Sequence, residues 1–327
     1  TIGDLREQLS KQYHRPAGAG LIIHHLKKLA TNIPHRIPTS TRTVCKILRE
    51  LGYITNPKKP THTPLDLIPP MEEWEMDFCE VYVPHEGMFE FFLVVDRGTS
   101  RVIYIEGHEH GYTAESALEA VFRLLSIHGL PKRLRFDRDT RFVASWSADS
   151  YPAPLIRFLR VIGVEPVICP PRRPDLKPYV ERCVYTFKYE WLKRFSWSTM
   201  AELYDIFPRF PHYHNIERIH QGRACNYKTP DEAFPQLPQL PELPRHVHPN
   251  SWISHYDGRV FRRTARSDGT IQVDKHVYSV KHLIPKQGVI VQLEASTRQF
   301  HLFQVGNAHL KPLAMKGLLP DEMELLD

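Results

Sequence analysis

Two proline-rich segments divide this chain and limit what its parts can fold into. Residues 57–70 and 236–250 carry prolines at short intervals, and proline removes backbone donors and breaks both helices and strands. We predict that both segments are extended linkers outside any hydrophobic core. The linkers separate three parts that are long enough to fold, followed by an acidic tail: residues 1–56, 71–235, 251–312 and 313–327.

The central part of the chain alternates between strand-like and helix-like patterns. Apolar, β-branched runs between turn residues predict strands over residues 74–82, 89–96, 101–105, 133–136 and 164–168. Helical periodicity and capping residues predict helices over residues 113–127, 154–162, 178–194 and 199–207. Three adjacent strands, followed by helices that alternate with two more strands, predict the α/β class with a mixed five-stranded sheet and flanking helices.

Two short helices are predicted in the first part, over residues 17–30 and 39–51, with a turn-rich connection between them. Two helices with such a break resemble a helix-turn-helix module, which binds DNA. In that module the second helix would present Arg42, Lys46 and Arg49 to DNA. The alternative is a helical hairpin that serves only packing.

The third part contains short alternating segments between turn signals, which predict a small C-terminal β-barrel. These segments cover residues 259–264, 270–274, 277–280, 288–294 and 299–304. Arg262 and Arg263, on the first segment, would belong to a surface that follows DNA phosphates. The alternative is that these charges serve solubility at strand edges.

Positive charge is concentrated at both ends of the chain. Residues 1–60 contain eleven Lys and Arg against three Asp and Glu, and residues 251–312 contain nine against four. The region between them is mildly acidic, although the whole chain has a net charge of +6. Two basic ends around an acidic centre predict a protein that binds double-stranded DNA through its phosphates.

Several other classes of protein are disfavoured. No apolar run approaches the roughly 20 residues that cross a bilayer, and the amino end lacks a secretory pattern. The five cysteines form no close pair, which argues against a disulfide framework and against a zinc site with the 19 histidines. We expect the histidines at surface or capping positions. We also expect a cytoplasmic, nucleoid-associated protein with no membrane partner.

Three carboxylates are easier to explain as metal ligands than as structural residues. Asp77 lies inside an apolar strand pattern, Asp137 directly follows another, and Glu181 lies in the first turn of a predicted helix. A carboxylate within an apolar strand carries a desolvation cost that a metal ion would offset. Two strand carboxylates and one helix carboxylate suit a pair of divalent ions that promote displacement at phosphorus.

Five motifs of the central part resemble those of DDE transposases and retroviral-type integrases, in the same order. They are Trp74–Phe78, Val94–Arg101, His128–Pro131, Phe136–Phe142 and Pro178–Arg182. The resemblance covers about residues 71–235, because His214–Gln221 and Thr229–Phe234 also resemble the segment after the core of bacterial insertion-sequence transposases. Each motif is weak alone, and their shared order makes the match specific.

This resemblance implies a ribonuclease H-like fold and two Mg²⁺ or Mn²⁺ ions. It matches Asp77, Asp137 and Glu181 to the first, second and third catalytic carboxylates of the family. We expect Asp77 to be the ligand shared by both ions. The implied activity is hydrolysis that frees 3′-hydroxyl groups at the ends of a mobile element, followed by strand transfer to target DNA. A homo-oligomer on DNA is implied, and an ATPase helper is a further candidate partner.

Further residues near the predicted helix are candidates for DNA binding. Lys188 follows Glu181 by two helical turns and so shares its face, where similar integrases place a DNA-contacting lysine. A solvated helix lysine is the alternative. Arg172, Arg173 and Lys177 precede the helix and would grip DNA in the same cleft.

The chain departs from the family pattern at two turns. It has Asp137-Arg138-Asp139 where relatives usually carry Asp-Asn-Gly, and Lys177-Pro178 where they usually carry Asn-Gly. Proline is acceptable in the first turn of a helix, so Glu181 keeps its place. Asp139 is a rival for the second carboxylate, and we favour Asp137 because it follows the strand directly. Asp96, before Arg97-Gly98-Thr99, is predicted to be a turn or salt-bridge residue.

The leading hypothesis from the sequence is a DDE transposase. The first rival is a ribonuclease H-like nuclease without strand transfer, which the two basic ends disfavour. The second rival is a domesticated DNA-binding protein that keeps the fold and lacks catalysis, which the presence of all three carboxylates disfavours.

Overall fold

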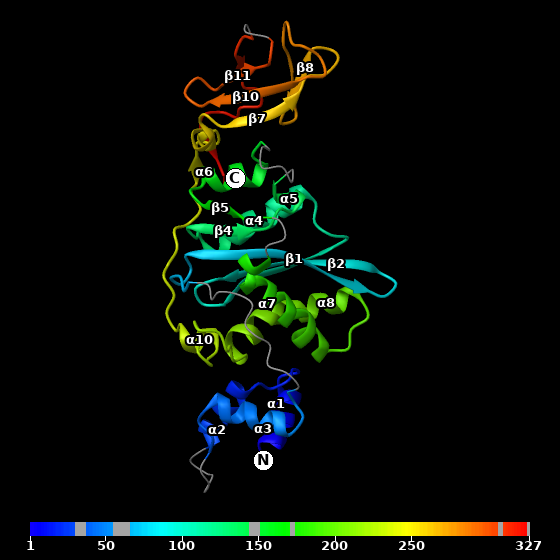
Figure 1. Ribbon diagram of the computed structural model, residues 1–327, viewed down its shortest axis with the longest axis vertical. Helices are drawn as coiled ribbons and strands as arrows, with labels where there is room; N and C mark the ends of the chain where they lie inside the picture. The colour runs from blue at the N-terminus through cyan, green and yellow to red at the C-terminus, as the bar shows by residue number, and fades with distance from the viewer. Residues whose placement is uncertain (30–36, 55–65, 144–150, 171–173, 307–309, 326–327) are drawn as a thin grey trace. The chain divides into compact units, whose positions relative to one another are not determined.

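The computed structural model describes the chain except for residues 30–36, 55–65, 144–150, 171–173, 307–309 and 326–327 (Figure 1). The chain forms two compact units. The first unit contains residues 1–112, 133–136 and 172–240, and the second contains residues 113–132, 137–171 and 241–327. Each unit combines segments that are distant in sequence. The boundaries of the three predicted parts stay predictions.

The central sheet has five strands, which confirms the predicted mixed α/β sheet. The strands are β1 (Glu73–Val83), β2 (Gly87–Asp96), β3 (Val102–Glu109), β4 (Arg133–Phe136) and β5 (Glu165–Ile168). Their order in the sheet is β3-β2-β1-β4-β5. β1 pairs antiparallel with β2, β2 pairs antiparallel with β3, and β1 pairs parallel with β4. β1 is therefore the strand where the antiparallel and parallel parts of the sheet meet.

The helical segment after β5 has the predicted bounds and is less regular than the sequence predicts. α7 (Pro178–Thr186) continues through a π-helical turn (Phe187–Trp191) and a 3₁₀ turn (Leu192–Arg194). The predicted helix over residues 178–194 is thus one helical segment of three types. α8 (Met200–Ile206), α9 (Phe210–His212) and α10 (Pro230–Ala233) follow. No helix among the described residues is long and apolar enough to cross a bilayer.

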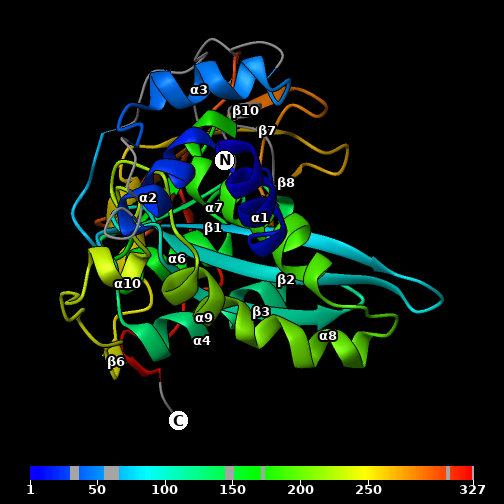
Figure 2. The same cartoon turned by 90° about the horizontal axis from the view of Figure 1, so that it is seen from below.

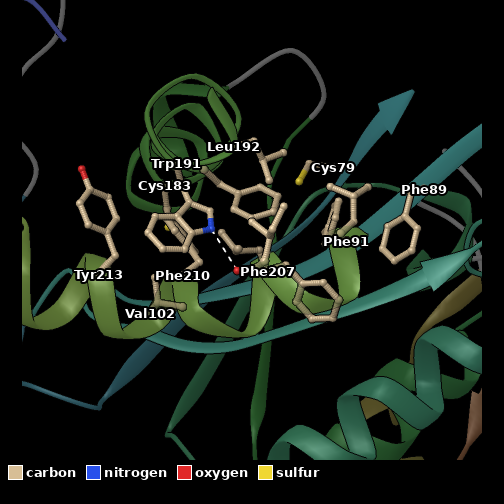
Figure 3. Packing of buried hydrophobic residues seen from close by; sticks show 14 of the residues in the cluster. Cys79, Phe89, Phe91, Val102, Cys183, Trp191, Leu192, Phe207, Phe210 and Tyr213 are labelled. Carbon is tan, nitrogen blue, oxygen red and sulfur yellow. Dashed lines mark hydrogen bonds between the residues drawn. The ribbon is translucent and has the colours of Figure 1, made fainter. Parts of the chain in front are cut away.

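A buried aromatic cluster joins α7 and the segments after it to β1, β2 and β3. Figure 3 labels side chains of this cluster on β1 (Cys79), β2 (Phe89 and Phe91) and β3 (Val102), and on the helical segments between Cys183 and Tyr213. The rings of Phe91 and Phe187 lie edge to face at 4.8 Å, and the indole of Trp191 donates a hydrogen bond to the carbonyl of Ile206. Figure 2 shows the same helices beside the three strands. Burial of these rings fixes α7 against the sheet.

The described residues of the first part of the chain form three helices, one more than predicted. α1 (Ile2–Gln12) was not expected from the sequence, whereas α2 (Ala19–Leu29) and α3 (Thr41–Glu50) match the predicted helices. Most of the predicted turn between α2 and α3 lies outside the described residues. Leu9, Leu21 and Leu48 form a small core with Ile219 from the region after α9. The helix-turn-helix role stays a prediction.

The second unit contains the remaining helices and the C-terminal strands. Its helices are α4 (Ala114–His128), α5 (Thr140–Val143) and α6 (Pro154–Val161). β7 (Val260–Thr264), β10 (Gly288–Glu294), β11 (Gln299–Phe303) and β12 (Leu313–Ala314) form one sheet in the order β12-β11-β10-β7. β8 (Thr270–Val273) pairs with β9 (His276–Ser279). The strands agree with the predicted segments, and closure into a barrel stays a prediction.

The predicted acidic tail is partly structured. β12 lies in it, and β13 (Met323–Glu324) pairs with β6 (His246–Val247), which comes from the predicted second linker. Arg245 and Glu324 form an ion pair beside this pairing at 2.6 Å. The predicted second linker and the predicted acidic tail are therefore joined by the antiparallel pairing of β6 with β13.

Replacing Phe91 tests whether the aromatic cluster holds the helices on the sheet. Phe91 is fully buried, so Phe91→Ala should lower the free energy of unfolding by ~3–5 kcal/mol. Tyr82→Ala, on the neighbouring strand at 64% exposure, is the control and should change it by less than about 0.5 kcal/mol. Urea denaturation measures both values. Equal effects of the two substitutions would contradict the assignment.

Candidate functional site

The three predicted carboxylates lie on the expected kinds of element. Asp77 is in β1, Asp137 is the residue after the last residue of β4, and Glu181 is in the first turn of α7. All three side chains are partly exposed. None of them is therefore sealed in a core. Asp77 and Glu181 belong to the first unit, and Asp137 belongs to the second.

Glu73, Glu75 and Asp77 project from one face of β1, because side chains alternate along a strand. Glu73 anchors a buried ionic network on this face: it contacts Arg97 at 2.7 Å and Arg133 and Arg135 of β4 at 2.6 Å each. Burial alone would raise the pKa of Glu73, but hydrogen bonds from the three guanidinium groups outweigh it and lower the pKa to about 2. Glu73 is thus a fixed negative charge that pairs β1 with β4.

Glu75 attaches α7 to the sheet. Its Oε2 accepts hydrogen bonds from the backbone N–H groups of Tyr179 and Val180, at 2.9 and 3.0 Å. The N-cap residue of α7, Lys177, makes no side-chain capping bond, so the carboxylate of Glu75 fills that role from a distant strand. Burial raises the pKa of Glu75 to about 7, although the two N–H groups and Arg97 favour its charged form.

Asp77 forms an ion pair with Lys177. The Nζ atom of Lys177 lies 3.2 Å from Oδ1 of Asp77, and the two side chains are 5% and 23% exposed. The same Oδ1 accepts a hydrogen bond from the backbone N–H of Phe78 at 3.0 Å. The lysine that precedes α7 is therefore directed at the first carboxylate rather than at solvent. A DNA contact by Lys177 stays a prediction.

No group of three or more His, Cys, Asp and Glu side chains in the described ranges is arranged to hold a metal ion. The donor chemistry nevertheless fits a hard divalent cation, because three carboxylates supply oxygen ligands only. In this structure the cation beside Asp77 is the ammonium group of Lys177. A metal ion at Asp77 would have to compete with that ammonium group.

The local structure after β4 bears on which aspartate is the second carboxylate. Asp137 accepts a hydrogen bond from the backbone N–H of Asp139 at 3.1 Å. Asp139 is engaged by Arg141, through its guanidinium group and its backbone N–H, in the first turn of α5. Asp139 thus has a local structural role. Asp96 also has one, because it accepts hydrogen bonds from Met71 and Thr99 at the end of β2, as predicted.

The predicted DNA-binding residues fall into three groups. Arg172 and Arg173 lie outside the described residues. Lys188 lies in the π-helical turn and lines a hollow with Glu80 and Val81 of β1, which keeps it on the β1 side of the helix. Arg42, Lys46 and Arg49 on α3 and Arg262 on β7 are exposed, whereas Arg263 on β7 is partly buried and its Nε donates a hydrogen bond to the carbonyl of Gln272. The DNA contacts of these five residues stay predictions.

The prediction of surface or capping histidines is wrong for two of them. His214 and His220 are 3% and 8% exposed, and the Nε2 atom of His220 lies 2.9 Å from the carbonyl oxygen of His214. Burial, with the charge of nearby Arg218, lowers the pKa of His220 to about 3. His214 contacts the carbonyl of Ser100 and is likewise held neutral by burial, which lowers its pKa. Both histidines serve as neutral hydrogen-bonding residues of the interior.

Sequence reasoning did not find Glu73, Glu75 or their arginine partners. A signal was present, because acidic residues at positions 73, 75 and 77 alternate with buried apolar ones, and arginines occupy positions 133 and 135 of the neighbouring strand. Alternating charges on two strands of one sheet require partners on a shared face. The pairing itself could not be read from the sequence.

One family model matches part of the chain. Residues 162–230 match the model of the integrase core domain family, which confirms the predicted resemblance to DDE integrases and transposases. None of the curated protein sequences matches the chain.

Solved integrase structures are similar to the chain at low identity. The catalytic core domain of HTLV-2 integrase, in complex with magnesium, is 14% identical over 51% of this chain and 99% of its own, with a TM-score of 0.39. A chain of the simian T-cell lymphotropic virus intasome, in complex with PP2A regulatory subunit B56 gamma, is 15% identical over 94% and 96%, with a TM-score of 0.44.

Substitution of Glu75 tests its role as the cap of α7. Glu75→Ala should lower the free energy of unfolding by ~2–5 kcal/mol, because it leaves the N–H groups of Tyr179 and Val180 without an acceptor, at roughly 1–3 kcal/mol each. Glu75→Gln keeps an acceptor oxygen and should cost only about 1–2 kcal/mol. Hydrogen exchange of the Tyr179 and Val180 amides should accelerate in the alanine variant alone. Exchange that stays slow in both variants would show that another group caps the helix.

Acid sensitivity tests the buried histidines. The folded pKa of His220 lies below its ordinary value of 6.5, so the unfolded chain binds the extra proton, and stability is lost as pH falls from 6.5 towards 3. Between pH 6 and 4 the loss should be about 1.4 kcal/mol per pH unit for this group. His220→Gln should remove this group's contribution to the loss of stability with falling pH. Urea denaturation of both proteins at several values between pH 6 and 4 measures the free energy of unfolding. If the free energy of unfolding falls equally with pH in both proteins, His220 is not a buried neutral residue.

Proposed function

We propose that this chain, which resembles integrase cores over residues 162–230, is a DNA transposase or integrase of the DDE type. The activity is metal-dependent cleavage at the ends of a mobile element followed by transfer of the freed 3′ ends to target DNA. The observation that carries the proposal is the attachment of α7 to β1 through Glu75, which precedes Asp77 by two residues in β1. It accepts hydrogen bonds from Tyr179 and Val180, which precede Glu181 by two residues and one. This link ties the strand of the first carboxylate to the helix of the third.

The register between β1 and β4 supports a role for Asp137. Glu73 pairs with Arg133 and Glu75 with Arg135, and ion pairs show that these side chains share a face. Asp77 follows Glu75 by two residues, and Asp137 follows Arg135 by two. Because side chains alternate along strands, the same register predicts Asp137 on the face that carries Asp77. The ribonuclease H-like assignment of the sheet, with its three carboxylates, rests on this pattern.

Asp77, Asp137 and Glu181 would hold two Mg²⁺ or Mn²⁺ ions, with Asp77 as the shared ligand. When bound, such ions activate the attacking oxygen and stabilise the leaving oxygen at phosphorus. In the first step water attacks the phosphodiester, one P–O bond forms, and the bond to the 3′-oxygen breaks. In the second step the freed 3′-hydroxyl attacks a target phosphodiester, and one P–O bond again replaces another.

Other residues of the chain would prepare this site. Glu75 and the Glu73 network hold the carboxylates of β1 and α7 in place, which avoids reorganisation during the reaction. Lys177 balances the charge of Asp77 before a metal arrives. Displaced from Asp77, its ammonium group would remain close enough to contact a DNA phosphate. Oligomerisation on DNA and nucleoid association belong to the same proposal.

A strand-transfer assay with candidate element ends and Mg²⁺ or Mn²⁺ tests the proposal. Asp77→Asn, Asp137→Asn and Glu181→Gln should each lower product formation by roughly 10³-fold or more, because each removes a ligand of ions that supply several kcal/mol to the transition state. Glu109→Gln, an exposed substitution on β3, should leave the rate unchanged. Asp139→Asn separates the rivals and should have a much smaller effect than Asp137→Asn.

The two rival functions give different results in the same assay. A chain that hydrolyses DNA and never joins it is a ribonuclease H-like nuclease. A chain that binds DNA and forms no product with either metal is a non-catalytic DNA-binding protein. Products that persist at full yield in Asp77→Asn would defeat the proposed site altogether.

A further inference from the structure

A cavity in the first unit lies away from the candidate carboxylates. It has a volume of about 710 Å³ and opens between the start of α7 and the segment after α9. α7 contributes Tyr179 and Arg182 to its lining. At about 100° per residue, Arg182 lies roughly 100° and Tyr179 roughly 160° around the helix from Glu181, which does not line the cavity. Its charged lining residues are Arg15, Asp175, Arg182, Arg218 and Arg223.

Positive charge exceeds negative charge at this cavity. Three of its arginines share one buried carboxylate, that of Glu190, which is 1% exposed. Arg218 binds Glu190 through two nitrogens at 2.8 and 3.2 Å, whereas Arg182 and Arg15 lie farther away, at 3.7 and 3.8 Å. With Arg223 and Asp175 included, four guanidinium groups face two carboxylates.

The excess charge is partly removed from water. The side chains of Arg218 and Arg15 are 4% and 11% exposed. The Nε atom of Arg15 is buried and has no hydrogen-bond partner among the described residues. Burial, with the charge of Arg218, lowers the pKa of Arg15 to about 10, as expected where neighbouring positive charge is incompletely balanced. His214 and His220 also line the cavity, and as neutral side chains they leave this charge unchanged.

We propose that this cavity binds a phosphate group. Guanidinium groups bind phosphate through paired, charge-assisted hydrogen bonds, and a partly dehydrated cluster of them attracts an anion more strongly than exposed lysines would. Arg182, which is 58% exposed and 3.7 Å from Glu190, can turn towards such a ligand, while Arg218 stays on Glu190. The phosphate is either part of the backbone of bound DNA, which rests on the proposed function, or a free phosphate compound.

The DNA source would give the cavity a defined part in the proposed reaction. A phosphate held by Arg182 would lie about 100° around α7 from Glu181. The cavity would thus hold a stretch of DNA beside the bond that is cut and not at it. Arg15, which follows α1 and donates a hydrogen bond to the carbonyl of Ile219, would link that contact to the N-terminal helices.

Calorimetric titration of the full chain with pyrophosphate, in buffer without divalent metal, tests the proposal. Arg182→Gln and Arg223→Gln should each weaken binding by about tenfold or more, whereas Arg182→Lys, which keeps the charge, should recover part of the loss. Arg182 is 58% exposed, so its substitution should leave the fold intact, and thermal melting checks this. Arg209→Gln is the matched control, because Arg209 is exposed and does not line the cavity.

Competition with a short duplex distinguishes the two sources of phosphate. If the duplex displaces pyrophosphate and its own binding weakens in Arg182→Gln, the ligand is the DNA backbone. If pyrophosphate binds beside the duplex without competition, the ligand is a free phosphate compound. Absence of pyrophosphate binding, or equal losses in Arg209→Gln and Arg182→Gln, would overturn the proposal. Asp77→Asn should bind pyrophosphate normally, so loss of strand transfer and loss of this site are separate results.

Discussion

The buried carboxylate of Glu75 is the contact on which the candidate site depends. It joins a central strand to the first turn of α7, and those two elements carry Asp77 and Glu181. A helix N-terminus needs acceptors for its free N–H groups, and here the acceptor comes from more than a hundred residues earlier in the chain. The position of α7 along β1 is therefore set by two hydrogen bonds as well as by packing.

The face of β1 towards α7 changes character along its length. Glu73, Glu75 and Asp77 lie in the polar half, whereas Cys79 and Val83 enter the aromatic cluster with Phe187 and Trp191. Asp77 lies at the boundary between these halves. The apolar half supplies the burial that holds α7 down, and the polar half supplies a fixed arrangement of charges. A carboxylate at that boundary is rigidly supported and still partly open to solvent.

Two clusters of buried ion pairs in the first unit each have one carboxylate at their centre. Glu73 collects three arginines on the sheet, and Glu190 collects three beside α7. The first cluster has Glu75 next to it and is closely paired. In the second cluster Glu190 binds Arg218 at 2.8 Å. Nitrogens of Arg15 and Arg182 lie 3.8 and 3.7 Å from the oxygens of Glu190, beside the cavity. The same residue types thus make a structural network in one place and a candidate anion site in the other, and geometry decides between them.

The sequence by itself determined the elements and the chemistry of the candidate residues. The five strands, the helices around them and the placement of Asp77, Asp137 and Glu181 could be predicted, because periodicity, capping and proline effects act over a few residues. Only the tertiary structure decided the partners: Glu75 with α7, Lys177 with Asp77, and the interior positions of His214 and His220. Those contacts join residues far apart in sequence. Their energies depend on burial and on which charges meet in space, and neither is encoded by local pattern.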